Sequence, residues 1–181
     1  MRILGISGSA RRDSHNTKLL RAAAELLPAG VELVEWEGLG ALPIFDEDLE
    51  ADRPEPVADL HAAMADADAV LIATPEYNHS IPGGLKNALD WASRPHSENP
   101  LRNKPALVIG ASTGLFGAVW AQAEARKVLA ALGAKVLEHE LPVGLADGAF
   151  AQDGTLADPE LSERLRSHLE SLTAAHQPVT V

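Results

Sequence analysis

The chain of 181 residues is long enough to bury a sizeable core, and its 46% hydrophobic and 23% charged residues are typical of a globular protein. A formal net charge of −11 argues against nucleic-acid and anionic membrane partners, because both attract basic surfaces. The absence of cysteine excludes disulfides, and no apolar run approaches the ~20 residues of a membrane span. We therefore expect a single cytoplasmic domain covering 1–181.

Strand-like and helix-like patterns alternate along the whole chain. Strands are expected at 2–7, 31–36, 68–75, 104–112 and 135–143, the last of them open to interruption at its end. Helices are expected at 16–27, 55–66, 83–93, 117–132 and 158–176, and the last residues, 176–181, should fray. Ser14 or Asn16 can cap the first helix, and Gly133 suits the position after the fourth.

This alternation predicts an α/β fold, in which a parallel sheet is covered by helices on both faces. In such folds the loops at the carboxyl ends of the strands form the binding crevice. Three loops of informative composition follow the first, third and fourth strands: "GSARRDSHN" (8–16), "TPEYNHSIPGG" (74–84) and "GASTGLFGA" (110–118). Their convergence at one edge of the sheet predicts the site.

The first loop has the groups that a phosphate needs. It offers the guanidinium groups of Arg11 and Arg12, the N-terminus of the following helix, and the hydroxyls of Ser7, Ser9, Ser14 and Thr17. It matches neither the Walker motif nor G-x-G-x-x-G. The alternative interpretation is a polar turn with a capped helix, and Arg12, beside Asp13, is expected to be a solvated surface charge.

Three motifs resemble those of the NADPH-dependent FMN reductase family, which belongs to the flavodoxin-like superfamily. The first is G-S-x-R-x-x-S-x-N, present here as Gly8, Ser9, Arg11, Ser14 and Asn16. The second is "PEYNHSIPGGLKNALDW" at 75–91, which is the most specific of the three. The third is "GASTGLFGAVWAQAEARKVLAALGA" at 110–134. The resemblance covers nearly the whole chain.

The resemblance implies a flavodoxin-like three-layer sandwich with a five-stranded parallel sheet of order 2-1-3-4-5. It also implies FMN bound without a covalent link at the ends of the first, third and fourth strands. The residues implied at the 5′-phosphate are Ser9, Arg11, Ser14 and Asn16, with the Thr17 hydroxyl beside them. Those implied at the ring or ribityl chain are Pro75, Glu76, Tyr77, Asn78, Ser80, Ser112, Thr113 and Gly114. Glu76 is expected to act through its main chain.

The implied reaction passes hydride from NADPH or NADH through FMN to a quinone, an azo compound, a free flavin or chromate. The chemistry belongs to the flavin, so no ionisable catalytic residue and no metal is expected. A flavodoxin-type electron carrier, which the acidic charge also fits, is the alternative, followed by a regulatory protein that has kept the fold. The sequence shows no separate cluster for a 2′-phosphate, so it does not indicate whether NADPH or NADH is preferred.

The resemblance further implies a homodimer or homotetramer. The helices at 84–93 and after 117 contain more apolar residues, among them Trp91 and Trp120, than are needed to cover the sheet, so part of these residues is expected to face a second subunit. The loop at 39–50 is long and contains Phe45 and Ile44. We expect this loop to pack against a second subunit and help to wall its flavin pocket, the alternative being that it folds back on its own subunit.

Overall fold

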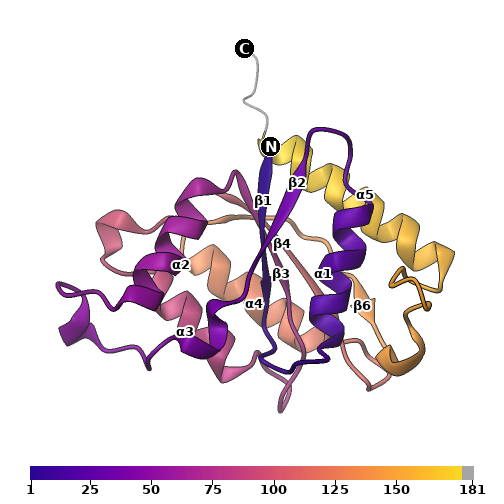
Figure 1. Ribbon diagram of the computed structural model, residues 1–181, viewed down its shortest axis with the longest axis horizontal. Helices are drawn as coiled ribbons and strands as arrows, with labels where there is room; N and C mark the ends of the chain where they lie inside the picture. The colour runs from indigo at the N-terminus through magenta and orange to yellow at the C-terminus, as the bar shows by residue number, and fades with distance from the viewer. Residues whose placement is uncertain (177–181) are drawn as a thin grey trace.

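A computed structural model describes residues 1–176 of the chain (Figure 1). Its strands are β1 (Arg2–Ser7), β2 (Glu32–Trp36), β3 (Ala69–Ala73), β4 (Pro105–Ala111), β5 (Lys135–Val136) and β6 (Pro142–Val143). Its helices are α1 (His15–Glu25), α2 (Glu55–Asp66), α3 (Gly83–Ala92), α4 (Val119–Ala131) and α5 (Pro159–His176). The tail that was expected to fray lies outside the described residues, except for His176, which ends α5.

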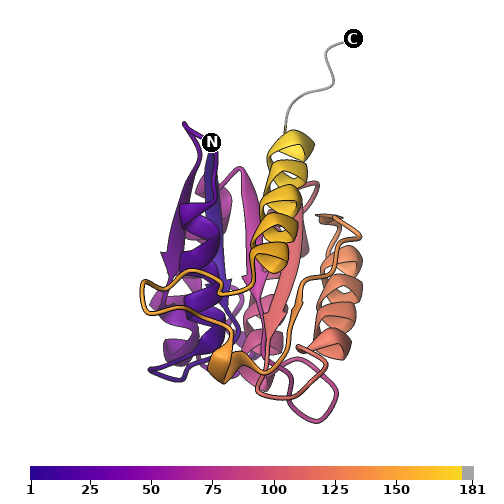
Figure 2. The same ribbon diagram turned by 90° about the vertical axis from the view of Figure 1, so that its right-hand side faces the viewer.

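The sheet has the order β2-β1-β3-β4-β5 with every pair parallel, which confirms the predicted flavodoxin-like order. Figures 1 and 2 show the sheet between two layers of helices, with α1 and α5 on one face and α2, α3 and α4 on the other. Each face has its own buried apolar cluster. Burial on both faces explains why β3 and β4 are continuous apolar runs.

The predicted last strand, 135–143, is in fact two short strands. Both β5 and β6 pair with β4, at Ala106↔Val136 and Gly110↔Pro142. Between these pairs, residues 107–109 of β4 face the longer segment 137–141, so the edge segment cannot stay in register and leaves the ladder. The interruption therefore lies in the middle of the predicted strand rather than at its end.

The loop between β2 and α2 folds against its own chain. Phe45 packs edge-on against the Trp91 ring at 5.0 Å, and its amide donates to Asn87 Oδ1 at 2.8 Å. Asn87 Nδ2 and Trp91 Nε1 both donate to Pro43 O at 2.9 Å. Phe45 thus packs on α3 of its own chain, as in the alternative that the loop folds back, but it is only partly buried. Ile44 is 87% exposed, so contact of the loop 39–50 with a second subunit stays a prediction.

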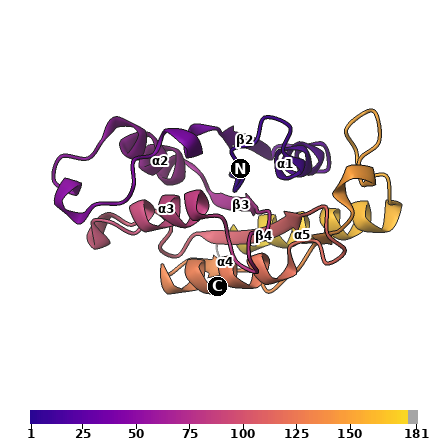
Figure 3. The same ribbon diagram turned by 90° about the horizontal axis from the view of Figure 1, so that it is seen from below.

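The carboxyl ends of the strands meet at the lower edge of Figure 1, onto which Figure 3 looks directly. Hydrogen bonds join the start of two loops to the end of the neighbouring strand. Gly8 N donates to Ala73 O at 2.8 Å, and Thr74 N donates to Ile109 O at 2.9 Å. The sheet thereby brings together the three loops singled out in the sequence. Within residues 1–176, no helix has both the length and the apolar character that crossing a membrane would need.

Candidate active site

The first loop ends in a capped helix. Ser14 is the N-cap of α1, and its Oγ accepts from Asn16 N at 3.2 Å and Thr17 N at 3.3 Å. The first turn contains no acidic residue, so the positive end of the helix dipole is available to an anion. Arg11 is exposed and takes part in no ion pair among the described residues.

Asn16 joins the first loop to the third. Its side chain, 2% exposed, donates from Nδ2 to Ala111 O and accepts at Oδ1 from Ala111 N, both at 2.9 Å. An amide nitrogen has two N–H groups, so one remains for a ligand. The neighbouring Thr17 Oγ1 donates to Ser7 Oγ at 3.0 Å, on the side of the loop that faces β2.

The second loop is a tight hairpin. Tyr77 and Ser80 exchange backbone hydrogen bonds of 3.0 and 3.1 Å, and the two residues between them, Asn78 and His79, have φ values of 54° and 60°. Positive φ at both central positions is the geometry of a type I′ turn. The turn leaves Tyr77 51% exposed at the edge of the site and carries Asn78 to its exposed tip.

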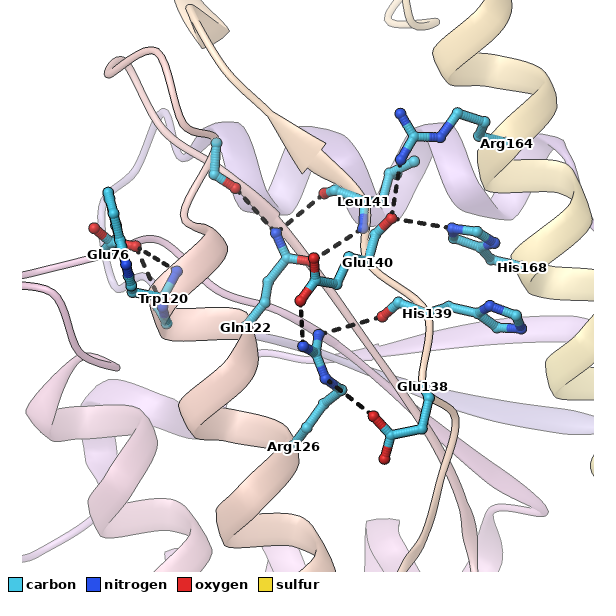
Figure 4. A network of polar contacts seen from close by, with 12 residues as sticks. Glu76, Trp120, Gln122, Arg126, Glu138, His139, Glu140, Leu141, Arg164 and His168 are labelled. Carbon is cyan, nitrogen blue, oxygen red and sulfur yellow. Dashed lines mark hydrogen bonds and ion pairs between the residues drawn. The ribbon is translucent and has the colours of Figure 1, made fainter.

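Glu76 has a role that the sequence did not reveal. Its Oε2 accepts from Trp120 N at 3.1 Å and Ala121 N at 3.2 Å, so the carboxylate caps α4, as Figure 4 shows. The residue before this helix, Ala118, has no side chain that could do so. Ser80 Oγ also turns to α4 and donates to Glu124 Oε2 at 3.1 Å. The second loop is thereby fixed to α4.

The third loop is held by the buried side chain of Gln122 (Figure 4). Its Nε2 donates to Gly117 O at 3.0 Å and Leu141 O at 3.3 Å, and its Oε1 accepts from Leu141 N at 3.1 Å. Gly117 has a φ of +56°, and a Cβ there would overlap the backbone of Pro142. Only glycine therefore allows the loop to lie this close to β6.

The three loops enclose a cavity of about 110 Å³, which we call the loop hollow. The predicted residues that line it are Ser9, Arg11, Ser14, Asn16, Pro75, Glu76, Tyr77, Ser112 and Thr113. Four other predicted residues, Thr17, Asn78, Ser80 and Gly114, lie outside its lining. His15 and Ala111 complete it and were not predicted. His15 lies between Ser14 and Asn16 of the first motif, and this position in the sequence was the signal that could have identified it.

Two larger cavities adjoin the loop hollow. The first, of about 470 Å³, is walled by Leu39, Tyr77 and Pro82–Gly84, and we call it the glycine hollow. The second, of about 400 Å³, lies between α1 and the end of β2 and contains Arg12, Arg21 and Glu37, and we call it the arginine hollow. Arg11 lines all three cavities, which makes it the centre of the site.

The donors of the loop hollow fit the phosphate of FMN. Hydroxyls, a guanidinium group and a helix N-terminus are the groups that bind a phosphate dianion, and all three kinds are present. Residues 8–18, the first loop and the start of α1, hold three Lys or Arg and one Asp, a net charge of +2 in a chain of −11. This local excess of positive charge attracts anionic ligands to this edge of the sheet.

Comparison with known proteins agrees with this arrangement. The family model of the NADPH-dependent FMN reductases matches residues 1–148. An NAD(P)H-dependent FMN reductase of Pseudomonas aeruginosa is 40% identical over 174 residues, covering 95% of this chain and 93% of that protein. A 2-hydroxy-1,4-benzoquinone reductase of Burkholderia is 35% identical, with coverages of 96% and 95%.

A solved structure is similar over almost its whole length. FerB, a flavoenzyme NAD(P)H:(acceptor) oxidoreductase of Paracoccus denitrificans, superposes with a TM-score of 0.85 at 36% identity. The alignment covers 97% of this chain and 96% of FerB. The family model and these relatives favour a reductase over an electron carrier or a regulatory protein. The chain belongs to the NADPH-dependent FMN reductase family, and it is a flavodoxin-like oxidoreductase that uses FMN and NAD(P)H.

Proposed function

We propose that FMN binds with its 5′-phosphate in the loop hollow. Ser9, Arg11 and the free N–H of Asn16 would hold the phosphate, together with the dipole of α1 behind the Ser14 cap. The isoalloxazine ring would lie along two segments, 75–78 and 112–114, and extend beyond the hollow toward Tyr77. Thr17 and Ser80 face away from the loop hollow, so they support the loops from outside.

When bound, FMN would take hydride from NAD(P)H and pass it to an acceptor. The residues of this chain contribute position and access. The glycine hollow would receive the flat nicotinamide and, after it leaves, the acceptor. The wall of the glycine hollow suits a planar ring. The space beside Gly83 is open, since no atom lies within 4 Å of the position that a Cβ would take, and the aromatic residue Tyr77 lies at the rim of the hollow.

A quinone is the acceptor class that we propose first. The Burkholderia relative is named for a benzoquinone, and the glycine hollow offers a mainly apolar wall to a ring of that size. Azo compounds, free flavin and chromate are the other acceptors that the family resemblance suggests. The observation that carries the proposal is Arg11, which lines the loop hollow and the glycine hollow alike and so connects cofactor to substrate.

We also propose that the chain acts in the cytoplasm as a homodimer or homotetramer of one domain, 1–181. Leu115, Phe116 and Trp120 are 69%, 60% and 44% exposed beside the site, and such a patch favours a protein partner. By contrast, Trp91, which had suggested an interface, is buried in its own core. Light scattering at micromolar concentration tests the assembly, since a particle near the 19.1 kDa of one chain refutes it.

Steady-state kinetics with NADPH and NADH against a panel of quinones, azo dyes, flavins and chromate test the reaction. In anaerobic mixing, NADPH should bleach the yellow FMN promptly, whereas an electron carrier would stay yellow. Gly83→Val should lower turnover of quinones without changing FMN affinity, because it narrows the glycine hollow alone. Gly148→Val is the matched control, since its Cβ also meets nothing within 4 Å and lies outside the glycine hollow.

A further inference from the structure

The arginine hollow is a cavity beside the flavin site, and the proposed function uses only one of its charged residues, Arg11. It shares Ser9 and Arg11 with the loop hollow and extends from there to the end of β2. Five charged residues line it: Arg11, Arg12, Arg21, Glu35 and Glu37. Its volume of about 400 Å³ is large enough for part of a nucleotide.

Most of these charges already have a partner. Arg21 donates to both carboxylate oxygens of Glu35, at 3.0 and 3.4 Å, so the two charges neutralise each other. Arg11 is engaged by the FMN phosphate in the proposed function. Arg12 and Glu37 remain, both exposed and neither in an ion pair within the described part of the chain. A cation and an anion are thus available at one cavity.

The distance from the flavin site suits a dinucleotide. The strand β2 lies two strands away from β3, whose loop carries Tyr77, and this separation is about 10 Å across the sheet. The pyrophosphate bridge of an extended pyridine nucleotide can span such a distance. With its nicotinamide near Tyr77, its other end can therefore reach the arginine hollow.

We infer that the arginine hollow binds the adenosine ribose of the pyridine nucleotide, and that Arg12 and Glu37 set the choice between NADPH and NADH. The Arg12 guanidinium pairs with the 2′-phosphate of NADPH, and the Glu37 carboxylate accepts from the 2′-hydroxyl of NADH. Glu37 directly follows β2 and lines the same cavity as Arg12. In this inference Arg12, which is exposed as the sequence led us to expect, becomes a specificity residue when the nucleotide binds. The inference rests on the proposed function.

The two residues should act in opposite directions. Arg12→Ala should raise the KM for NADPH relative to that for NADH by about 10-fold or more, the loss of one charge-assisted contact. Glu37→Gln should lower the same ratio, because it removes a charge that repels the 2′-phosphate. The matched control is Lys18→Ala, an exposed basic residue of α1 that lines a different cavity, and it should leave the ratio unchanged.

Binding of 2′,5′-ADP to the FMN-loaded protein, measured by calorimetry, tests the site without turnover. It should saturate, compete with NADPH, and weaken at least ~10-fold in Arg12→Ala. An unchanged affinity in Arg12→Ala, or a loss in Lys18→Ala instead, overturns the inference. A protein that oxidises neither nucleotide refutes the proposed function, whereas one that oxidises both with an unchanged KM ratio in the two variants refutes only the inference.

Discussion

Replacing Asn16 tests whether this residue stabilises the fold by joining two loops or only binds the cofactor. In the structure its side chain bridges α1 and the end of β4 through two hydrogen bonds of 2.9 Å to Ala111. Both bonds lie in a buried environment, and both join groups of the protein itself. We therefore expect Asn16→Ala to destabilise the apoprotein as well as to weaken FMN binding.

The expected loss of stability follows from the backbone groups of Ala111 that Asn16→Ala leaves without a hydrogen-bond partner. Asn16→Ala leaves the N–H and C=O of Ala111 without their partners in the interior, and each such group costs about 1–3 kcal/mol. Partial access of water to the new cavity lowers the sum, so the free energy of unfolding should fall by about 2–4 kcal/mol. For a chain of this size, that corresponds to roughly 5–15 °C in Tm.

The assay is urea unfolding of FMN-free protein, with FMN affinity measured separately by fluorescence titration. Arg11→Ala is the counterpart, because its exposed side chain has no ion pair to lose within residues 1–176. It should weaken FMN binding ~10- to 100-fold and leave apoprotein stability unchanged. If Asn16→Ala behaves in the same way, with unaltered stability of the apoprotein, then Asn16 is a ligand residue and the reasoning above is refuted.

Two further predictions concern polar side chains that bond to the backbone of another segment. Glu76→Ala should lower the free energy of unfolding by about 1–2 kcal/mol, because α4 loses its cap. Glu76→Gln keeps an acceptor oxygen and should lower this free energy by less. Chemical denaturation of both variants measures the difference. Burial lowers the pKa of His61, whose Nε2 lies 2.9 Å from Trp91 O. The unfolded state then binds more protons below about pH 6.5, so stability should fall as the pH drops, and His61→Gln should flatten that slope in urea titrations between pH 5 and 8.

The fold was predictable because its signals are local. Buried strands are short apolar runs, Gly133 follows the fourth helix, and the loops at the strand ends have distinct compositions. The exception, the last strand, fails for a reason that is not local. Whether 137–141 can pair depends on the number of β4 residues facing it, which only the register provides. The site was predicted at the level of loops for the same reason, since parallel strands bring their carboxyl ends together.

The functions of individual site residues could not be predicted in the same way. Glu76 contacts amides 44 and 45 positions later, and Asn16 contacts a residue 95 positions away. No pattern within a short window indicates such partners. The packing of the long β2–α2 loop could not be decided from the sequence for a related reason: the partners of Phe45 on its own chain, Asn87 and Trp91, lie more than 40 positions later.

The polar residues of the site fall into two groups with different energetic consequences. Asn16, Glu76 and Gln122 connect the first, second and third loops to segments elsewhere in the chain. Arg11 and Tyr77 are exposed at the cavities that these loops enclose. Loops held in this way lose little conformational freedom when a cofactor binds, so most of the contact energy goes into affinity. A change in the first group should therefore alter stability and binding together, and a change in the second should alter binding alone.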